Sequence, residues 1–501
     1  MPGIDFLFAA ITPFHIAIAL GGVIAGTVIG SLPGLTATMA IAVLVPLTFS
    51  MEPASALILM GAIYTGAIYG GAYSAILLNT PGTPSAIATT FDGFPMAKRG
   101  DGDLAVTLAC IASVVGGMVG AAFLLGLAPP LAAVALAFGP VEYFWLAMFG
   151  LTLIAALSEG SLMKGLIGGS FGLLLSCIGV AEVSADIRFT FGSQTLLGGI
   201  ELVSALIGLY CIPVLMDLVA TPARHLEVGE SRGIRFMEAL KISWRTKFNL
   251  VRSAVIGTLV GILPGAGGSI AGLVAYSEAR RSSKRSEHFG TGEPEGIQAT
   301  ESANNATVGG GFIPTLVLGI PGTPPDAVVL GALLVQGVRT GPQLFTSGEG
   351  SIVYTFIYGL FLATLLMLPT GLLIGRYAYK TIVSVPKSML VPTVAFMTII
   401  GSYSIRNSVS DVIIMILLGV MGWILGRFGF TPSPIVLGLI LSRIAEQGFV
   451  QAWTIGAATD ELGVMFFGRP ISLGIIAFIL LSLFYPLVAK RIKLGRNGNN
   501  G

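Results

Sequence analysis

The chain has 501 residues, of which 54% are hydrophobic and 10% charged, and its mean hydropathy is +0.88. Soluble domains carry about 25% charged residues, and a soluble chain of this length would need several charged domain surfaces. Twenty-seven basic and 25 acidic side chains cannot supply them, so the composition speaks against a soluble enzyme and favours a protein embedded in the lipid bilayer. The net charge of +2 gives no indication of nucleic-acid binding.

In chain order, the first half begins with two apolar regions that Pro and Gly interrupt, Phe14–Phe49 and Ser55–Ala97. Apolar runs of about 20 residues predict helices that cross a bilayer. The uninterrupted runs that follow in the first half are Leu104–Leu127, Glu142–Leu157, Leu162–Val180 and Leu196–Val219. We therefore predict a first membrane region over residues 1–220.

A stretch rich in Lys and Arg, residues 221–252, predicts a cytoplasmic linker to a second membrane region over residues 253–450. This region also begins with two interrupted segments, Ser253–Ala279 and Ile297–Val338. Its uninterrupted runs are Ser351–Gly375, Met389–Gly401, Val409–Gly426 and Pro434–Val450. Residues 451–501 add a last helix, Ile471–Val488, and a basic tail. The expected fold is an all-α integral membrane protein with about 11–12 spanning segments.

Two motifs occur twice in the chain. The segment Gly26–Gly34 (GTVIGSLPG) recurs 231 residues later as Gly257–Gly265 (GTLVGILPG). The segment Tyr69–Pro84, which ends in NTPGTP, recurs 240 residues later as Gly309–Pro324, which ends in GIPGTP. Because both matches keep their order and nearly the same offset, we predict two related structural repeats rather than a chance likeness between Gly- and Pro-rich segments.

Small residues recur at every fourth position in both copies of the first motif. In the first copy they are Gly22, Gly26, Gly30 and Gly34, and in the second they are Ser253, Gly257, Gly261 and Gly265. Such a stripe predicts close packing of one membrane helix against another.

The basic residues predict the orientation of the chain, because cytoplasmic loops are enriched in Lys and Arg. Placing the basic clusters inside puts 22 of the 27 there, with the N-terminus outside and the C-terminus in the cytoplasm. Ser253–Ala279 has basic residues at both ends and Pro264-Gly265 in its middle, which predicts a re-entrant helical hairpin that enters from the cytoplasm. The equivalent segment Phe14–Phe49 has no basic residue at either end and is predicted to enter from outside. The repeats are therefore expected to be inverted, each with one hairpin and one broken helix, an architecture of secondary transporters.

Four breaks in these helices are predicted to form the functional site: Leu32–Thr36, Asn79–Ser85, Leu263–Ser269 and Gly319–Thr323. A half-helix start presents N–H groups to an anion, and a half-helix end presents carbonyl groups to a cation such as Na⁺. The predicted substrate- and ion-binding residues are Thr36, Asn79, Thr80, Gly82, Thr83, Ser85, Gly265, Gly267, Ser269, Asn304, Asn305, Gly322 and Thr323. Glu301 and Asp326 are the nearest acids and are predicted as possible coupling acids.

Structural roles remain open for several of these residues. Small polar residues such as Asn79, Thr80 and Thr83 also cap helices, and Asn304 and Asn305 could hydrogen-bond between helices. Glu301 could instead lie at the cytoplasmic end of its helix. The three Cys and three His residues form no metal-binding or catalytic pattern, so no catalytic residue, resident metal or cofactor is predicted.

Three segments resemble a known family. GTVIGSLPGLTATM (Gly26–Met39), YGGAYSAILLNTPGTPSAIA (Tyr69–Ala88) and EGIQATESANNATVGGGFIPTLVLGIPGTP (Glu295–Pro324) are similar to the signature segments of the TctA family. That family is the large permease subunit of tripartite tricarboxylate transporters, and the likeness extends over essentially the whole chain. The resemblance implies a multi-pass protein of the bacterial inner membrane that imports carboxylates, citrate-like tricarboxylates among them, with a cation gradient, generally Na⁺. It also implies two partners, a small membrane subunit of about four helices and a periplasmic solute-binding protein.

Three other functions are weighed against carboxylate symport. Re-entrant hairpins also build passive channels. A self-sufficient carboxylate transporter would need no binding protein, and the sequence alone does not distinguish it from a tripartite one. An intramembrane enzyme is disfavoured, because the apolar segments contain no His-Ser or Cys-His pair that could serve as base and nucleophile and no cluster of metal ligands.

Overall fold

The computed structural model describes residues 4–157, 162–181, 183–220, 233–346, 350–378 and 385–497. Regular structure in these ranges is helical except for one short antiparallel pair, β1 (Gly179–Val180) and β2 (Ile187–Arg188). Eight helices among the described residues are long and apolar enough to cross a membrane. They are α2 (Pro13–Ser31), α4 (Pro53–Leu78), α6 (Gly102–Ala135), α9 (Leu202–Ala220), α16 (Gly350–Leu373) with the π-helical turn η5 (Ile374–Ala378), α18 (Lys387–Arg406), α19 (Val409–Arg427) and α20 (Pro432–Ala458). The chain is thus a helical, multi-pass membrane protein.

Four further helices cover other apolar segments predicted from the sequence and are not among these eight. They are α7 (Pro140–Leu157), α8 (Leu162–Ser176), α13 (Pro294–Leu318) and α22 (Pro470–Asn497). The run predicted to reach Val180 ends its helix at Ser176, and Gly179 at φ +114° then enters β1. The run predicted to begin at Leu196 starts its α-helix at Leu202, after the short 3₁₀ turn η3 (Gln194–Leu196).

The first interrupted region forms two helices joined by a tight turn. Helix α2 ends at Ser31, and α3 (Ala37–Leu44) begins after Thr36, whose Oγ1 accepts a hydrogen bond from the Met39 N–H. The short helix η1 (Val45–Thr48) follows α3, and α4 then packs along α2. Helix α4 ends at Leu78, and the chain continues through η2 (Pro84–Ala86) into α5 (Thr90–Lys98).

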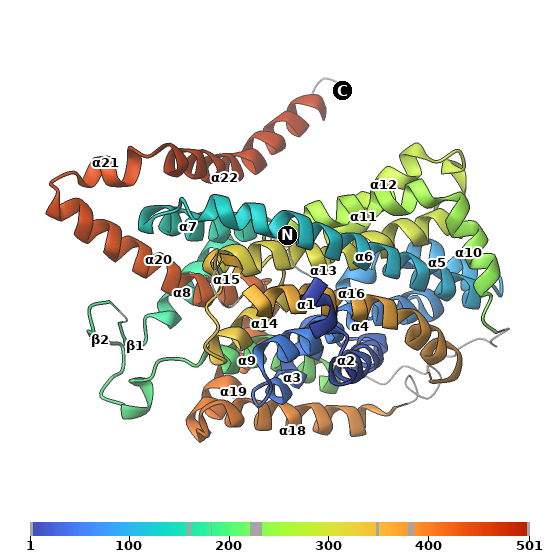
Figure 1. Cartoon of the computed structure of the whole chain (residues 1–501), viewed down its shortest axis with the longest axis horizontal. Coiled ribbons are helices and arrows are strands. Elements are labelled where there is room, and N and C mark those ends of the chain that lie inside the picture. Colours follow the sequence, from blue (N-terminus) through green and yellow to red (C-terminus); the bar gives the residue numbers. More distant parts are fainter. Residues whose placement is uncertain are drawn as a thin grey trace. The chain divides into compact units, whose positions relative to one another are not determined.

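The second interrupted region repeats this order of elements. After α10 (Phe236–Arg245), α11 (Lys247–Ile262) and α12 (Gly267–Ser282) pack against each other around the turn at residues 263–266 (Figure 1). The turn η4 (Ser286–His288) leads to α13, which packs along both helices. The helices α14 (Pro324–Val335) and α15 (Gln343–Thr346) follow. The short helices α1 (Ile4–Ala10) and α21 (Leu462–Phe467) complete the described elements.

The chain divides into two compact units, and each draws on both halves of the sequence. Unit 1 contains residues 1–132 and 210–412, and unit 2 contains residues 133–209 and 413–501. All four predicted breaks lie in unit 1. In unit 2, α7 and α8 pack against α20, and the Arg188 guanidinium donates to both carboxylate oxygens of Glu446 at 2.8 and 3.1 Å.

Glycine lets the paired helices of unit 1 approach closely. A β-carbon added to Gly30 on α2 would lie 2.1 Å from the carbonyl oxygen of Ala67 on α4. In the second region, a β-carbon on Gly261 of α11 would lie 2.8 Å from the carbonyl oxygen of Thr307 on α13. Because real β-carbons do not approach other atoms within 3 Å, neither position accepts a larger residue without a shift of the backbone.

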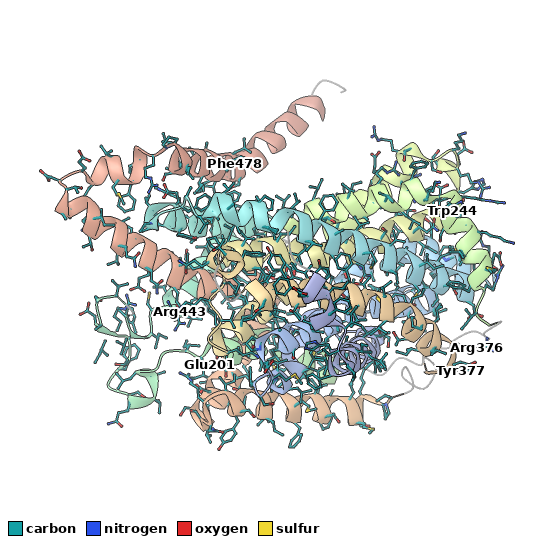
Figure 2. The ribbon with its side chains drawn as sticks, viewed as in Figure 1. Glu201, Trp244, Arg376, Tyr377, Arg443 and Phe478 are labelled. Carbon is teal, nitrogen blue, oxygen red and sulfur yellow. The ribbon has the colours of Figure 1, made fainter. Side chains whose placement is uncertain are left out.

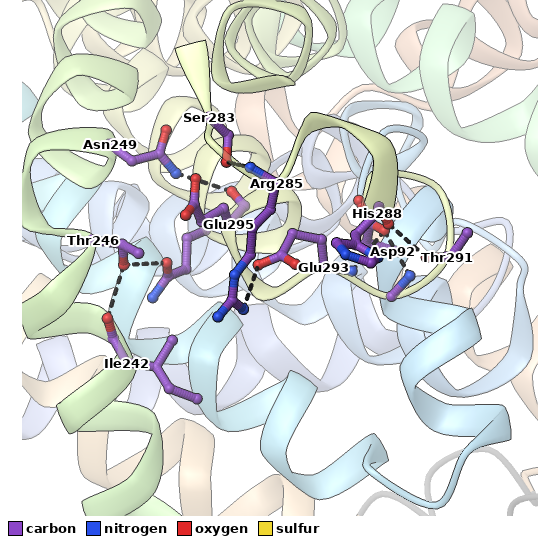
Figure 3. Close-up of polar contacts among 12 residues, drawn as sticks. Asp92, Ile242, Thr246, Asn249, Ser283, Arg285, His288, Thr291, Glu293 and Glu295 are labelled. Carbon is purple, nitrogen blue, oxygen red and sulfur yellow. Dashed lines mark hydrogen bonds and ion pairs between the residues drawn. The ribbon is translucent and has the colours of Figure 1, made fainter. Parts of the chain in front are cut away.

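The buried carboxylate of Asp92 on α5 holds the loop between α12 and α13 through hydrogen bonds (Figure 3). Its Oδ1 accepts hydrogen bonds from the N–H groups of Gly290, Gly292 and Glu293, each at 2.8 Å, and its Oδ2 accepts one from the Tyr276 hydroxyl at 2.9 Å. Burial raises the pKa of the neighbouring Glu293 carboxyl above its ordinary value, although the Arg285 guanidinium lies 3.9 Å from that carboxylate and opposes the rise. Asp92 therefore joins α5 of the first region to the loop between α12 and α13 of the second.

Helix α10 is amphipathic and keeps large apolar side chains exposed. Trp244, labelled in Figure 2, is 71% exposed, and Phe248 at the start of α11 is 81% exposed. The ammonium group of Lys247 lies 4.7 Å from the centre of the Trp244 ring. Aromatic and basic side chains of this kind are typical of the boundary between a bilayer and water.

Candidate functional site

The structure brings three of the four predicted breaks together. The N–H of Gly265, in the turn between α11 and α12, donates a hydrogen bond to the carbonyl oxygen of Gly322 at 2.8 Å. Helix α12 also packs against η2, which overlaps the end of the break after α4. In the matching arrangement, α3 packs against α14, which follows the break after α13. Helix α12 of the second half therefore contacts the chain at the break after α4 of the first half, and helix α3 of the first half contacts the helix that follows the break after α13 of the second half.

One group of polar residues surrounds Gly268 at the start of α12, and we call it the Asn304 group: Thr83, Ser85, Gly268 and Asn304. A β-carbon on Gly268 would lie 2.2 Å from Asn304 Oδ1 and 2.8 Å from Ser85 Cβ. The hydroxyl oxygens of Thr83 and Ser85 are 2.8 Å apart. Residues from three predicted breaks or their helices thus meet at one glycine.

Asn304 and Asn305 are fully buried in α13, and neither side chain has a hydrogen-bond partner among the described residues. An unpaired buried polar group costs about 1–3 kcal/mol. Two adjacent, unpaired carboxamides in one helix are therefore unfavourable for the protein alone. Polar groups of this kind occur where a ligand completes their hydrogen bonds.

A second group of polar residues, the Asp326 group, consists of Tyr64, Thr323 and Asp326. The Tyr64 and Thr323 hydroxyl oxygens are 2.8 Å apart, and Thr323 Oγ1 donates to Asp326 Oδ2 at 2.5 Å. Thr323 also caps α14 by accepting from the Asp326 N–H at 3.5 Å. The other carboxylate oxygen, Asp326 Oδ1, is buried and has no hydrogen-bond partner among the described residues.

Glu301, the other predicted acid, has a different environment. It is fully buried in α13 rather than exposed at the helix end. Thr89 Oγ1 donates to one of its carboxylate oxygens at 2.5 Å, and Ser113 Oγ donates to the other at 3.2 Å. Both oxygens of Glu301 are thus already bonded within the protein.

Several predicted residues do not join either group. Asn79 is exposed and ends α4 in the left-handed region at φ 54°, as Gly319 ends α13 at φ 70°. Thr80 bonds within its own turn, where its Oγ1 donates to the Leu78 carbonyl oxygen at 3.3 Å. Thr36 caps α3, and Ser269 is half-buried in the first turn of α12.

The predicted glycines have backbone roles. Gly82 and Gly322 are the glycines of the two PGTP motifs. A β-carbon on Gly82 would lie 2.4 Å from the carbonyl oxygen of Gly30, and one on Gly322 would lie 2.7 Å from the carbonyl oxygen of Gly261. Gly265 and Gly267 have φ values of +84° and +58°, which favour glycine in the turn.

Sequence reasoning missed Tyr64, Thr89 and Ser113. The sequence does contain a signal for Tyr64. When the two copies of the second motif are aligned at their offset of 240 residues, Tyr64 aligns with Asn304, which was selected. Each of these two residues lies on the long helix of one half and reaches the break region of the other half. Thr89 and Ser113 carry no comparable signal.

Basic residues lie away from both groups. Helices α3, α4, α13 and α14 and the turn η1 contain no Lys, Arg or His within their described bounds, and the basic residues of α12, Arg280 and Arg281, lie in its last turn, whereas Gly268 lies in its first turn. Buried oxygens and carboxamides therefore have no permanent positive charge beside them, and only helix ends supply partial charges. Such an arrangement can hold an anion and a cation together more readily than either ion alone.

The sequence matches the tripartite tricarboxylate transporter TctA family over residues 16–437. It is 35% identical over 490 residues to an uncharacterized 52.8 kDa protein in the TAR-I ttuC' 3' region of Agrobacterium vitis, covering 97% of this chain and 96% of that protein. It is also 35% identical over 238 residues to an uncharacterized protein in the TAR-II ttuC' 3' region of the same organism, covering 47% of this chain and 97% of that protein. No solved structure matches the chain significantly. The chain therefore belongs to the tripartite tricarboxylate transporter TctA family and is the large membrane subunit of such a transporter.

Proposed function

We propose that this subunit imports tricarboxylate-like organic acids by symport with a cation, Na⁺ being the expected one, through alternating access. The observation that carries the proposal is the pair of buried, unpaired carboxamides of Asn304 and Asn305. Carboxamide N–H groups donate well to carboxylates, and the start of α12 at Gly268 adds backbone donors beside Asn304. A co-bound cation balances the substrate charge, because α4 and α13 contain no basic residue and those of α12 lie in its last turn, away from Gly268.

The two halves are proposed to be inverted repeats, each with a re-entrant hairpin and a broken helix. Equivalent close contacts support this proposal. Gly26 and Gly257 crowd the carbonyl oxygens of Ile63 and Ala303, which are equivalent in the repeat. Gly70 and Gly310 crowd the carbonyl oxygens of Thr27 and Thr258, which are equivalent in the same way. The repeat boundaries are residues 1–220 and 253–450, with residues 221–252 as the linker, of which residues 221–232 lie outside the described ranges.

The breaks of both halves are proposed to move together and carry the substrate across the membrane. Their common location in unit 1 supports this mechanism. Hydrogen bonds also join the two halves of the sequence, between the hydroxyl groups of Tyr64 and Thr323 and from the Gly290 N–H to the Asp92 carboxylate. Movement of one body that holds the substrate is a usual route to alternating access.

The proposed setting is the bacterial inner membrane, with the N-terminus in the periplasm and the C-terminus in the cytoplasm. The partners are a small membrane subunit of about four helices and a periplasmic binding protein that delivers the carboxylate. Cysteine labelling tests the orientation. A thiol introduced at Ser50 should react with an impermeant reagent from outside, and one at Ser283 only after the membrane is opened.

The test of function is carboxylate uptake by proteoliposomes that contain the complete complex. We expect accumulation of labelled citrate or a related acid against its gradient, and loss of uptake when choline replaces Na⁺. Asn304→Ala should reduce uptake by at least about tenfold, because a donor to the substrate is lost. Thr307→Val is the matched control, since Thr307 Oγ1 donates only to the Asn304 carbonyl oxygen of its own helix at 2.6 Å.

Three results would contradict parts of the proposal. Equilibration without accumulation would indicate a passive channel, and full uptake without the binding protein would indicate a self-sufficient transporter. Unchanged uptake by Asn304→Ala would assign the carboxamide to helix packing rather than to the substrate.

A further inference from the structure

We propose that the free carboxylate oxygen of Asp326, Oδ1, binds the monovalent cation that drives transport, and that Tyr64 and Thr323 position this carboxylate. The inference deepens the proposed symport and rests on it. Its evidence is the arrangement of the three side chains and the composition of the helices around them.

The hydrogen bonds of Asp326 leave one oxygen available. Thr323 Oγ1 donates to Oδ2 at 2.5 Å, and the Tyr64 hydroxyl, 2.8 Å from Thr323 Oγ1, can then donate to Thr323. This chain of donors fixes the carboxylate in one orientation. Oδ1 is buried and receives no hydrogen bond from the described residues. A purely capping role for Thr323 and Asp326 explains the bonded oxygen but not the free one.

A charge at this position requires a cation. Asp326 is completely buried, and the elements that pack against α14 are α3, η1, α4 and α13. Their only acids are Glu295 and Glu301, and they contain no Lys, Arg or His. The start of α14 stabilises a carboxylate only partly, because a helix end carries about half an elementary charge. A buried carboxylate without a paired cation is strongly unfavourable. A bound monovalent cation would therefore stabilise the charged carboxylate of Asp326 more than the helix end does.

Glu301 provides the internal comparison. It is as deeply buried as Asp326, but Thr89 and Ser113 donate to its two oxygens. Each of its oxygens therefore has a donor within the protein. Of the two buried acids near the breaks, Asp326 alone presents an oxygen that the described protein does not use.

The position of Asp326 also links the cation to the substrate route. Thr323 is the last residue of the break after α13, and Tyr64 belongs to α4 of the first half. A cation on Oδ1 therefore stabilises the contact between the two halves through Thr323. This explains how its binding could favour one arrangement of the moving unit.

The experiment uses the complete complex in proteoliposomes and compares Asp326→Asn with Glu301→Gln. Initial uptake is measured against internal and external Na⁺, and separately against a pH gradient without Na⁺. Substrate counterflow, the exchange of labelled for unlabelled carboxylate across the membrane, is measured with equal ion concentrations on both sides. We expect Asp326→Asn to lose the dependence on the driving cation while it keeps measurable counterflow. Glu301→Gln should keep the wild-type cation dependence.

The Na⁺ and pH arms identify which cation Asp326 binds. Loss of the Na⁺ response alone assigns Na⁺ to Oδ1, and loss of the pH response alone assigns a proton.

An Asp326→Asn protein with wild-type cation dependence would overturn the inference while leaving carboxylate symport intact. If Asp326→Asn does not assemble, Asp326→Glu, which keeps the charge but moves it, should shift the half-saturating cation concentration by at least about fivefold. An unchanged half-saturating concentration in Asp326→Glu would also overturn the inference. A wild-type complex that transports no carboxylate would refute the proposed function itself.

Discussion

The hydroxyl groups of Tyr64 and Thr323 are separated by 259 residues in the sequence, yet their oxygens lie 2.8 Å apart. Tyr64 belongs to the long helix α4 of the first half, and Thr323 ends the break of the second half. Asn304, which lies 240 residues after Tyr64 in the sequence, crowds Gly268 together with Ser85 of the first half. Each half therefore contributes a polar side chain to the break region of the other.

Removing the Tyr64 hydroxyl should weaken cation binding without unfolding the protein. In Tyr64→Phe, Thr323 loses a hydrogen-bond partner and holds Asp326 less firmly, so we expect the half-saturating Na⁺ concentration to rise by about fivefold, as loss of one hydrogen bond of about 1 kcal/mol predicts. The measurement is initial uptake against Na⁺ concentration. Tyr73→Phe is the control, because the Tyr73 hydroxyl donates to the backbone carbonyl of Gly371, away from the Asp326 group. Equal shifts in the two variants would assign the effect to general packing.

Gly30→Ala and Gly261→Ala should destabilise the protein. In each variant the new methyl group meets a backbone carbonyl oxygen of the neighbouring helix, at 2.1 and 2.8 Å respectively. Overpacking of this kind costs about 1–3 kcal/mol, which lowers the melting temperature of the purified protein in detergent. Gly21→Ala on α2 is the matched control, because a β-carbon there has no neighbour within 4 Å. A melting temperature unchanged in Gly30→Ala would contradict the close approach of α2 and α4.

Thr83 and Asn79 should respond differently to substitution, although both lie in the same break. Thr83→Val should reduce uptake strongly, because Thr83 is buried and shares a hydrogen bond with Ser85 in the Asn304 group. Asn79→Gly should keep most uptake, because glycine adopts the left-handed backbone at the end of α4. Asn79→Ala, which disfavours that backbone, should lose stability. A complete loss of uptake in a stable Asn79→Gly protein would instead assign the Asn79 side chain to the substrate or ion.

Asp92→Asn should loosen the loop between α12 and α13. A neutral carboxamide accepts hydrogen bonds more weakly than the carboxylate that now receives three N–H groups and a tyrosine hydroxyl. Hydrogen exchange at Gly290, Gly292 and Glu293 should become faster by at least about tenfold. Glu287→Gln, on an exposed residue of the same loop, should leave these rates unchanged. Equal exchange rates in Asp92→Asn and the wild type would show that Asp92 does not hold the loop.

The sequence predicted the helical class, and motif comparison located the segments that matter. The helix ends at Leu78 and Leu318 agree with the Pro-Gly pairs that follow each of them within four residues, because such a pair disfavours continuation of a helix. Other boundaries moved, as at Ser176 and Leu202, because an apolar run does not show where its helix begins or ends. The close glycine contacts agree with the small-residue stripe that the sequence contains.

The grouping of the candidate site could be predicted only in part. Thr83, Ser85, Asn304, Thr323 and Asp326 were selected because they lie near breaks, and the structure places them in two groups. Asn79 was selected by the same rule but caps its helix at the protein surface. Proximity to a break does not determine the direction of a side chain, which depends on the helices packed around it.

What the sequence by itself determined is the membrane class, the family and the duplicated breaks, because composition, motifs and the residues that interrupt helices are local properties of the chain. Only the tertiary structure decided which buried acid keeps a free oxygen. Glu301 and Asp326 look alike in the sequence, but Thr89 and Ser113 donate to both oxygens of Glu301, whereas the described part of the chain supplies a side-chain donor to only one oxygen of Asp326. Those donors come from other helices, and the energy of a buried charge depends on every group that surrounds it in space.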